Sequence, residues 1–287
     1  MSEREPITLD SPQAHINREL SWLSFARRVL ALAEDPDQPL LERVKFAGIM
    51  GMIYDEFAMK RIGGLCRQVE KSDQKPGLDG LTPAEELAAC RQELRAQPGL
   101  VARLVEEELR PALGDLGIPI YDMDALTQDE REALARYFIE SVEPILTPLA
   151  ADAAHPFPFI SNLGLNLAVQ VTDPGRHRGR FVRIKVPANR PRWIPIPNRR
   201  GWVPLEQVIA ANLGVLFPLA TGISCSFFRV IRGAKDDPWK DLAGPEDADL
   251  SPGAIIGMVT TELTARRFAG VVRLEVSADM PEALRSW

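Results

Sequence analysis

The stretch from Arg176 to Arg200 concentrates positive charge in an otherwise acidic chain. It contains eight arginines and Lys185 with no acidic residue, whereas the whole chain of 287 residues has a formal net charge of −6. Closely spaced cations can hold the oxygens of a polyanion, such as nucleic acid, a nucleotide or an inorganic phosphate chain. The candidate polyanion contacts are Arg176, Arg178, Arg180, Arg190, Arg192, Arg199 and Arg200.

The two-residue period of a β-strand divides these cations between two faces. Arg183 and Lys185 share one face of an expected strand, and the apolar residues between and after them share the other. A solvated sheet face and a subunit contact therefore stay open as alternatives to polyanion binding.

The common motifs of phosphate and metal chemistry are missing from the sequence. It has no GxxxxGK[ST] loop, no GxGxxG after a strand, no HExxH and no GxSxG. A histidine that carries a phosphoryl group needs basic neighbours, which His155 lacks, and His177 in RHRGR fits a solvated charge cluster. The residues alone therefore predict no catalytic group and no metal ligands.

Composition sets further limits on the class of protein. The three cysteines, Cys66, Cys90 and Cys225, stand too far apart for a zinc or redox motif, which favours idle thiols in a reducing compartment. The N-terminus is acidic and polar, and no apolar run reaches the roughly 18 residues of a membrane span. We expect a cytoplasmic protein without a transmembrane segment.

The first part of the chain has the periodicity of helices. Trp22, Phe25, Val29 and Leu32 recur at steps of three and four residues, which predicts one apolar stripe. A long helix is expected over 40–75, interrupted or softened near Gly48, Gly51 and the Gly63-Gly64 pair.

Two capping boxes mark later helices. Thr82 to Glu85 opens a helix through about Ala96, with another expected from about Gly99 to Leu113, and Thr127 to Glu130 opens a third through about Val142. The remaining elements are strands at Leu165–Val171, Phe181–Val186, Trp193–Ile196, Cys225–Ile231 and Val271–Val276, with helices at Leu205–Leu216 and Ile255–Phe268.

The predicted fold class is α+β. An N-terminal helical bundle is followed by an α/β head domain with a mixed or antiparallel sheet. Residues 1–115 carry 15 Lys and Arg against 20 Asp and Glu, so most of the acidic excess precedes the change in character. This shift predicts domains at about 1–114 and 115–287.

Two stretches resemble the polyphosphate kinase family, the large bacterial enzymes that reversibly move the terminal phosphate of ATP onto inorganic polyphosphate. They are INRELSWLSFARRVLALAEDPDQPLLERVKF with DEFAMKRIGGL at 16–65, and ILTPLAADAAHPFPFISNLGLNLAV at 145–169. Weaker likenesses are DGLTPAEELAA at 79–89 and RRFAGVVRLEVSADMPEAL at 266–284. Together they extend over nearly the whole chain in family order.

The resemblance implies an N-terminal helical domain and a head domain that forms a homodimer. The family's two following domains, which carry the phosphorylated histidine and the residues that bind magnesium and phosphate, have no counterpart in this sequence. ATP and Mg²⁺ are cofactors of the full-length family, and neither is expected to bind tightly to this chain alone. The chain is therefore expected to be inactive by itself.

The purine contact of the family is altered here. Where the family has a run like SSNLDEFF, with an asparagine near the adenine of ATP, this chain has Ile53 in the asparagine's place, followed by Tyr54. Isoleucine has no hydrogen-bonding side chain. Ile53 and Tyr54 are therefore the candidate cofactor residues. Tyr54 could stack on the purine or hydrogen-bond to it, and the alternative is that Ile53 and Tyr54 complete the packing of the helix.

Other matching residues favour structural roles. Glu56 and Lys60 are four apart on a helix, and Asp55 could reach Arg61 only through a bend. Asn17 is expected to cap the helix that follows it.

Three hypotheses follow. The first is the front part of a polyphosphate kinase, which serves nucleotide-side architecture and dimerisation. The second is a non-catalytic shortened paralogue that scaffolds or regulates a full-length kinase. The third is a polyanion-binding module that takes polyphosphate in preference to nucleic acid.

Overall fold

Two units with separate hydrophobic cores make up the chain. The computed structural model describes residues 7–71, 75–151, 159–174, 179–233 and 270–285. Contacts group Met1–Leu109 with Ile231–Arg273 in the first unit, and Arg110–Val230 with Leu274–Trp287 in the second. The helix predicted at Ile255–Phe268 lies outside the described residues.

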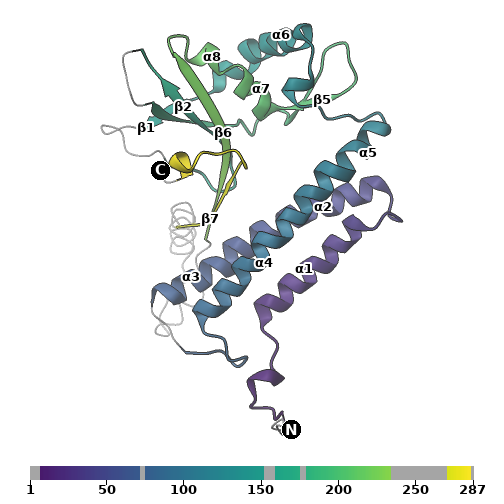
Figure 1. The fold of residues 1–287 in the computed structure, drawn as a ribbon, viewed down its shortest axis with the longest axis vertical. Helices are drawn as coiled ribbons and strands as arrows, with labels where there is room; N and C mark the ends of the chain where they lie inside the picture. Colours follow the sequence, from purple (N-terminus) through teal and green to yellow (C-terminus); the bar gives the residue numbers. More distant parts are fainter. Residues whose placement is uncertain (1–6, 72–74, 152–158, 175–178, 234–269, 286–287) are drawn as a thin grey trace, which may run out of the picture. The chain divides into compact units, whose positions relative to one another are not determined.

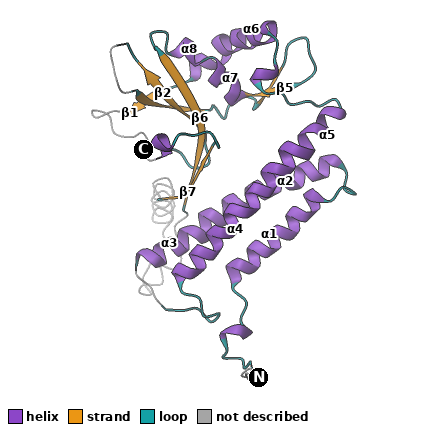
Figure 2. Ribbon diagram, viewed as in Figure 1, coloured by secondary structure: helices purple, strands orange, loops and turns teal. Residues whose placement is uncertain are grey.

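Helices dominate the first unit, as Figures 1 and 2 show. The described elements are η1 (Pro12–Ala14), α1 (Arg18–Glu34), α2 (Leu40–Phe57), the π-helix η2 (Ala58–Ile62), α3 (Gly63–Glu70), α4 (Pro83–Arg103) and the π-helix η3 (Leu104–Leu109). The long helix expected from residue 40 is interrupted by η2 directly before the Gly63-Gly64 pair, as predicted for that pair, whereas α2 runs unbroken past Gly48 and Gly51.

The buried face of α1 is displaced by one residue from the predicted stripe. Leu23, Ala26 and Leu30 are fully buried, whereas Phe25 and Leu32 are 47% and 39% exposed. Both stripes have helical spacing, so periodicity alone does not choose between them. The helix turns its smaller residues inward, where it packs against α2 and α4.

The break predicted between two helices near residues 96–99 is absent, because α4 runs without interruption to Arg103 and η3 continues from there to Leu109. The Thr82 capping box forms as expected, with the Thr82 N–H donating to Glu85 Oε2 at 2.8 Å. The helix then continues through Pro98, although proline removes one backbone hydrogen bond. Leu94 and Gln97 are buried on the preceding turn, and this packing holds the helix together.

The second unit combines helices with a sheet. Its helical elements are α5 (Arg110–Asp115), η4 (Met123–Ala125), α6 (Gln128–Tyr137), η5 (Phe138–Val142), η6 (Glu143–Ile145), α7 (Leu205–Ala211), α8 (Leu213–Leu216) and α11 (Glu282–Arg285). Its strands are β1 (Leu149–Ala151), β2 (Leu165–Thr172), β3 (Arg180–Lys185), β4 (Trp193–Pro195), β5 (Trp202–Pro204), β6 (Gly222–Arg232) and β7 (Val271–Val276). The ends of β6 and β7 group with the first unit.

The main sheet is five-stranded with the order β1-β3-β2-β6-β7. The pairs β1/β3, β2/β3 and β2/β6 are antiparallel, and β4 and β5 form a separate antiparallel pair. The predicted α+β fold, a helical region followed by a head domain with an antiparallel sheet, is confirmed. The sequence missed β1 and β5, each only three residues long.

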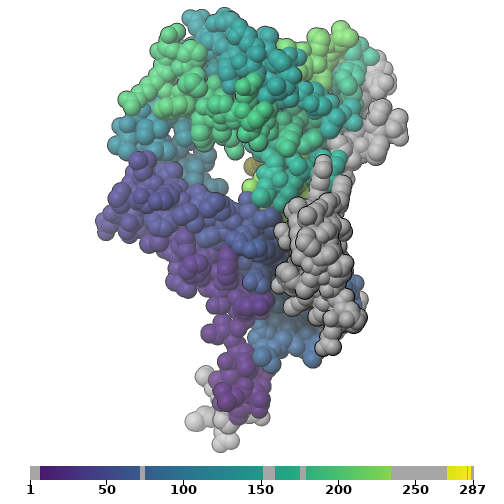
Figure 3. Space-filling model, turned by 180° about the vertical axis from the view of Figure 1, so that it is seen from behind, coloured from purple at the N-terminus to yellow at the C-terminus, as the bar shows by residue number. Residues whose placement is uncertain are grey.

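Both faces of the central strands are buried. Leu167 and Ile184 face a core that includes Phe138 of η5 and Leu205 of α7. The opposite face contributes residues such as Phe181 to a second cluster. Figure 3 shows the teal and green residues of this unit in space-filling form.

The helices of the described ranges are all too short or too polar to cross a lipid bilayer.

Candidate functional site

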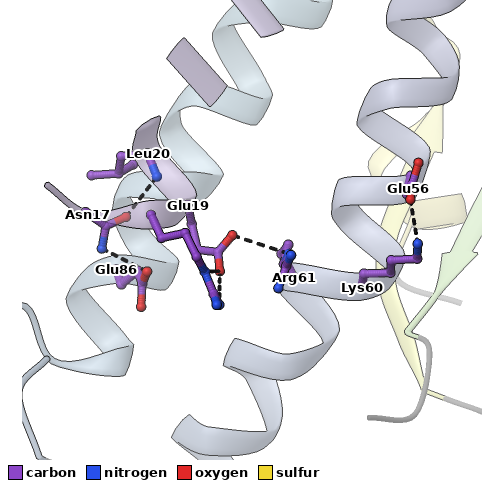
Figure 4. A network of polar contacts seen from close by, with 8 residues as sticks. Asn17, Glu19, Leu20, Glu56, Lys60, Arg61 and Glu86 are labelled. Atoms are coloured by element: carbon purple, nitrogen blue, oxygen red, sulfur yellow. Dashed lines mark hydrogen bonds and ion pairs between the residues drawn. The ribbon is translucent and has the colours of Figure 1, made fainter. Parts of the chain in front are cut away.

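A polar network fixes the beginning of α1 to the beginning of α4 (Figure 4). Asn17 Oδ1 accepts a hydrogen bond from the Leu20 N–H at 2.8 Å, which confirms the predicted helix cap. Its amide nitrogen donates to Asp79 Oδ2 at 2.6 Å and to Glu86 Oε1 at 2.8 Å. One side chain therefore caps one helix and ties it to another.

Glu19 is a buried carboxylate held by two arginines. The residue is 5% exposed. Arg18 donates to its Oε1 from Nε and Nη2 at 2.9 and 2.6 Å, and Arg61 Nε lies 3.5 Å from its Oε2. Because a buried carboxylate is stable only when it is paired, Arg18 compensates Glu19 within the first turn of α1, and the Arg61 contact ties that turn to η2.

The charged pair at the end of α2 is exposed. Lys60 Nζ lies 2.5 Å from Glu56 Oε1, which confirms the ion pair expected between residues four apart on a helix (Figure 4). Both side chains are more than half exposed, so the pair adds only about 0.3 to 0.5 kcal/mol. Arg61 turns toward Glu19, a contact that the sequence did not suggest.

The π-helix η2 is the main feature of this region that sequence reasoning missed. It covers Ala58–Ile62, within the run DEFAMKRIGGL. Such π-helical turns are rare and often occur at functional sites. The Gly63-Gly64 pair that follows is a local signal for an interruption or softening of an α-helix, but it does not specify a π-helical turn.

Tyr54 belongs to the helical core. It is 4% exposed, and its hydroxyl donates to Gln97 Oε1 at 3.1 Å. The Gln97 amide in turn donates to the Leu23 carbonyl at 3.2 Å and to Glu93 Oε2 at 3.0 Å, so the network joins α1, α2 and α4. Ile53 packs, partly buried, against the same core. These positions favour the packing alternative over purine contact.

Burial raises the pKa of Tyr54 to about 12. The neutral phenol is thereby stabilised in the folded state, and this contribution is present below the ordinary pKa near 10 and lost as the pH rises toward 12. At neutral pH Tyr54 is therefore a hydrogen-bond donor to Gln97.

Replacing Tyr54 by phenylalanine should lower the free energy of unfolding by about 1 to 2 kcal/mol, because Gln97 Oε1 loses its buried donor. Urea denaturation followed by circular dichroism measures the difference. The matched control is Tyr137→Phe, since the Tyr137 hydroxyl has no hydrogen bond within the described part of the chain. Equal effects of the two substitutions would contradict the role given to the Tyr54 hydroxyl.

Two of the candidate arginines are held by carboxylates and aromatic rings. Arg199 lies 3.3 Å from Glu130 Oε2, and its guanidinium sits 3.9 Å from the centre of the Tyr121 ring. Arg180 Nε lies 3.0 Å from Asp173 Oδ2. Both arginines therefore have structural partners.

The other described candidates differ in their pairing. Arg192 Nη2 lies 2.5 Å from Glu206 Oε1. Arg190 and Arg200 are exposed, as is Lys185, and among the described residues none of the three has an ion-pair partner. Arg176 and Arg178 lie outside the described residues, as do His155 and His177.

Arg183 is a buried cation that the strand pattern did not reveal. It is 7% exposed, and its Nε donates to Asn166 Oδ1 at 2.8 Å. Burial lowers the pKa of Arg183 below its usual value. On the strand face that the two residues share, Arg183 is therefore buried and Lys185 is exposed.

No metal centre emerges from the part of the chain that is described. There, no three His, Cys, Asp or Glu side chains gather closely enough to hold a metal ion. Burial raises the pKa of Cys90 and of Cys225 to about 12, which keeps both thiols protonated at neutral pH.

Comparison with known families covers nearly the whole chain. The polyphosphate kinase N-terminal domain matches residues 15–121, and the polyphosphate kinase middle domain matches residues 129–287.

Individual relatives agree with these matches. A polyphosphate kinase of Thermosynechococcus vestitus is 43% identical over 98% of this chain and 38% of its own length. A polyphosphate kinase of Mycolicibacterium gilvum is also 43% identical, over 94% of this chain and 37% of its own. The chain thus spans somewhat more than a third of the length of these relatives.

A solved structure shares the fold. The crystal structure of polyphosphate kinase from Porphyromonas gingivalis superposes with a TM-score of 0.73 at 23% identity, covering 94% of this chain and 36% of that one. This chain belongs to the polyphosphate kinase family and carries that family's N-terminal and middle domains.

Proposed function

We propose that this chain forms the N-terminal and head part of a polyphosphate kinase and contributes nucleotide-side architecture and dimerisation. The whole enzyme would reversibly transfer the terminal phosphate of ATP to inorganic polyphosphate in the cytoplasm. The observation that carries this proposal is the presence of both family domains, in order, over nearly the full chain.

The proposal assigns this chain a supporting role and no phosphoryl transfer of its own. Phosphoryl transfer needs several positioned cations and a nucleophile around one phosphate. In the described first unit Arg61 ties η2 to α1 through Glu19, while Arg18 pairs with Glu19 within the first turn of α1 and Lys60 pairs with Glu56 one turn earlier on the same run. These contacts support an architectural role.

ATP and Mg²⁺ would be the cofactors of the whole enzyme, and we propose that neither binds tightly to this chain alone. Ile53 offers no hydrogen bond to a purine, and the hydroxyl of Tyr54 is already directed at Gln97.

The head domain is proposed to form a homodimer. Val215, Leu219 and Ile223 are 46%, 80% and 36% exposed within one short stretch of the second unit, which suits a surface covered by a second copy. Sedimentation velocity over a range of concentrations tests this. A dimer is expected, with Leu219→Asp shifting it toward monomer, and a wild-type chain that stays monomeric throughout would overturn the dimerisation.

The second candidate, a non-catalytic paralogue that scaffolds a full-length kinase, is favoured by Ile53 in the asparagine's place. It predicts mixed dimers. A tagged chain should capture a co-expressed full-length polyphosphate kinase from the same cell, and failure to capture it would count against this role.

A further inference from the structure

A cavity of about 720 Å³ lies in the second unit, at one end of the main sheet. The turn at 161–165 before β2 forms one wall, and residues 185–192 after β3 form another. The middle of β6 at residues 227–229 and the end of β7 at residues 275–277 complete it. None of the candidates in the first unit lines this cavity.

Positive charge dominates the lining. Four cations, Lys185, Arg190, Arg192 and Arg229, line the cavity together with one carboxylate, Glu275. Arg229 Nη2 lies 2.5 Å from Glu275 Oε2, and Arg192 is paired with a glutamate of α7. Lys185 and Arg190 have no ion pair with any described residue, so two positive charges remain uncompensated by the described carboxylates.

A third positive charge lies behind this wall. Arg183 is two residues from Lys185 on β3 and therefore on the same face. It is 7% exposed and, within the described ranges, is bonded to Asn166 Oδ1 with no carboxylate partner. A charge buried behind a cavity strengthens the potential inside it, because it is poorly screened by solvent.

The turn before β2 supplies an unused hydroxyl. Ser161 Oγ is buried and has no hydrogen-bond partner among the described residues. A buried polar atom of this kind calls for a missing partner such as water or an ion. At Gly164 a Cβ would lie 2.9 Å from Ser161 Oγ and 3.5 Å from Lys185 Cε, so the hydroxyl and the lysine stem border the same small space.

The turn itself is firmly held. Leu163 adopts a positive φ of 61°, and its N–H donates to the Val230 carbonyl at 2.9 Å. The Asn166 amide donates to the Gly164 carbonyl at 2.6 Å. Because these bonds occupy the backbone of the turn, Ser161 Oγ is fixed beside Lys185 before any ligand arrives.

We propose that this cavity binds the phosphate oxygens of a short phosphate chain, with Lys185 and Arg190 as the charged contacts and Ser161 Oγ as a neutral donor. Such a chain is either part of inorganic polyphosphate or the triphosphate of a nucleotide. The cavity holds only a few phosphate units, and the net charge of −6 disfavours a long nucleic acid. This site would bind phosphate without transferring it, so a chain that failed to bind phosphate here could still have the architectural role proposed above.

The test compares two double variants of the full 287-residue chain. Lys185→Gln with Arg190→Gln removes two charges inside the cavity, and Arg95→Gln with Arg103→Gln removes two exposed charges from α4. Binding of fluorescent short-chain polyphosphate is measured by anisotropy at several salt concentrations. We expect the cavity variant to bind roughly ten- to a hundredfold more weakly, with a salt slope reduced by about two, and the α4 variant to bind like wild type.

Further arms separate the ligand sources. Ser161→Ala should weaken binding severalfold without changing the salt slope, since it removes a neutral donor. Competition by tripolyphosphate and by ATP distinguishes the phosphate chain from the nucleotide, because a nucleotide site favours ATP over tripolyphosphate. The proposal would be overturned if both double variants weakened binding equally, or if the wild-type chain bound neither polyphosphate nor ATP. It would also be overturned if the wild-type chain bound single-stranded DNA more tightly than polyphosphate.

Discussion

Replacing Phe57 by alanine should lower the free energy of unfolding of the first unit by about 3 to 5 kcal/mol. Phe57 is 1% exposed at the end of α2, and its ring stacks on Trp22 of α1 with centroids 4.8 Å apart. The substitution leaves a cavity in the core and removes an aromatic pair. Urea denaturation followed by circular dichroism measures the loss.

Phe25→Ala is the matched control for this prediction. Phe25 has the same side chain on a helix of the same core but is 47% exposed. Its removal should change the stability by no more than about 0.5 kcal/mol. Trp22 lies in the run INRELSW and Phe57 in the run DEFAMKRIGGL, both of which resemble the family. If Phe57→Ala changed the free energy of unfolding as little as the control, the structural role given to these two runs would be contradicted.

Replacing Gly201 by alanine should destabilise the second unit by about 2 to 4 kcal/mol. Gly201 has a φ of 142°, and a Cβ there would lie 2.5 Å from Tyr121 Cε2 and 3.2 Å from the Pro119 carbonyl oxygen. The ring cannot simply withdraw, because Arg199 stacks on it at 3.9 Å. Thermal melting should show a clear fall in the transition temperature.

Gly214→Ala provides the control for Gly201. Gly214 lies in the short helix α8 with nothing within 4 Å of its Cβ position. Alanine there should leave stability unchanged or raise it by up to about 1 kcal/mol. If Gly201→Ala melted like Gly214→Ala, the close packing of residues 119–121 against β5 would be wrong.

Local signals predicted much of the fold. The capping boxes at Thr82 and Thr127 place helix starts correctly, because reciprocal hydrogen bonds between a cap and the third helical residue depend only on neighbouring residues. The β-rich runs from Leu165 onward likewise became strands, since both faces of the sheet are buried and the residues are apolar and branched.

Features that depend on tertiary packing were not predictable in the same way. Which stripe of α1 faces inward depends on how α2 and α4 pack against it, and Pro98 stays within α4 beside the buried Leu94 and Gln97 of the preceding turn. The π-helix η2 likewise has no periodic signature in the sequence.

The candidate site could be predicted only in outline. The composition of the sequence identifies the basic stretch. Only the sheet register and the neighbouring loops show that some of its arginines are paired, that Arg183 is buried, and that Lys185 and Arg190 line the cavity. The burial of Tyr54 also depends on Gln97, which lies far along the chain on another helix. Neither the sorting of the basic residues nor the contact between Tyr54 and Gln97 can be deduced from the spacing of residues in the sequence.

The most direct test of the central claim is a transfer assay with γ-labelled ATP, Mg²⁺ and a polyphosphate primer. We predict that the purified 287-residue chain, for which we propose an architectural role without phosphoryl transfer, forms no labelled polymer above the blank. A full-length polyphosphate kinase serves as the positive control. Labelled polyphosphate at the roughly 1 to 100 turnovers per second typical of kinases, persisting after host enzymes are excluded, would contradict the account.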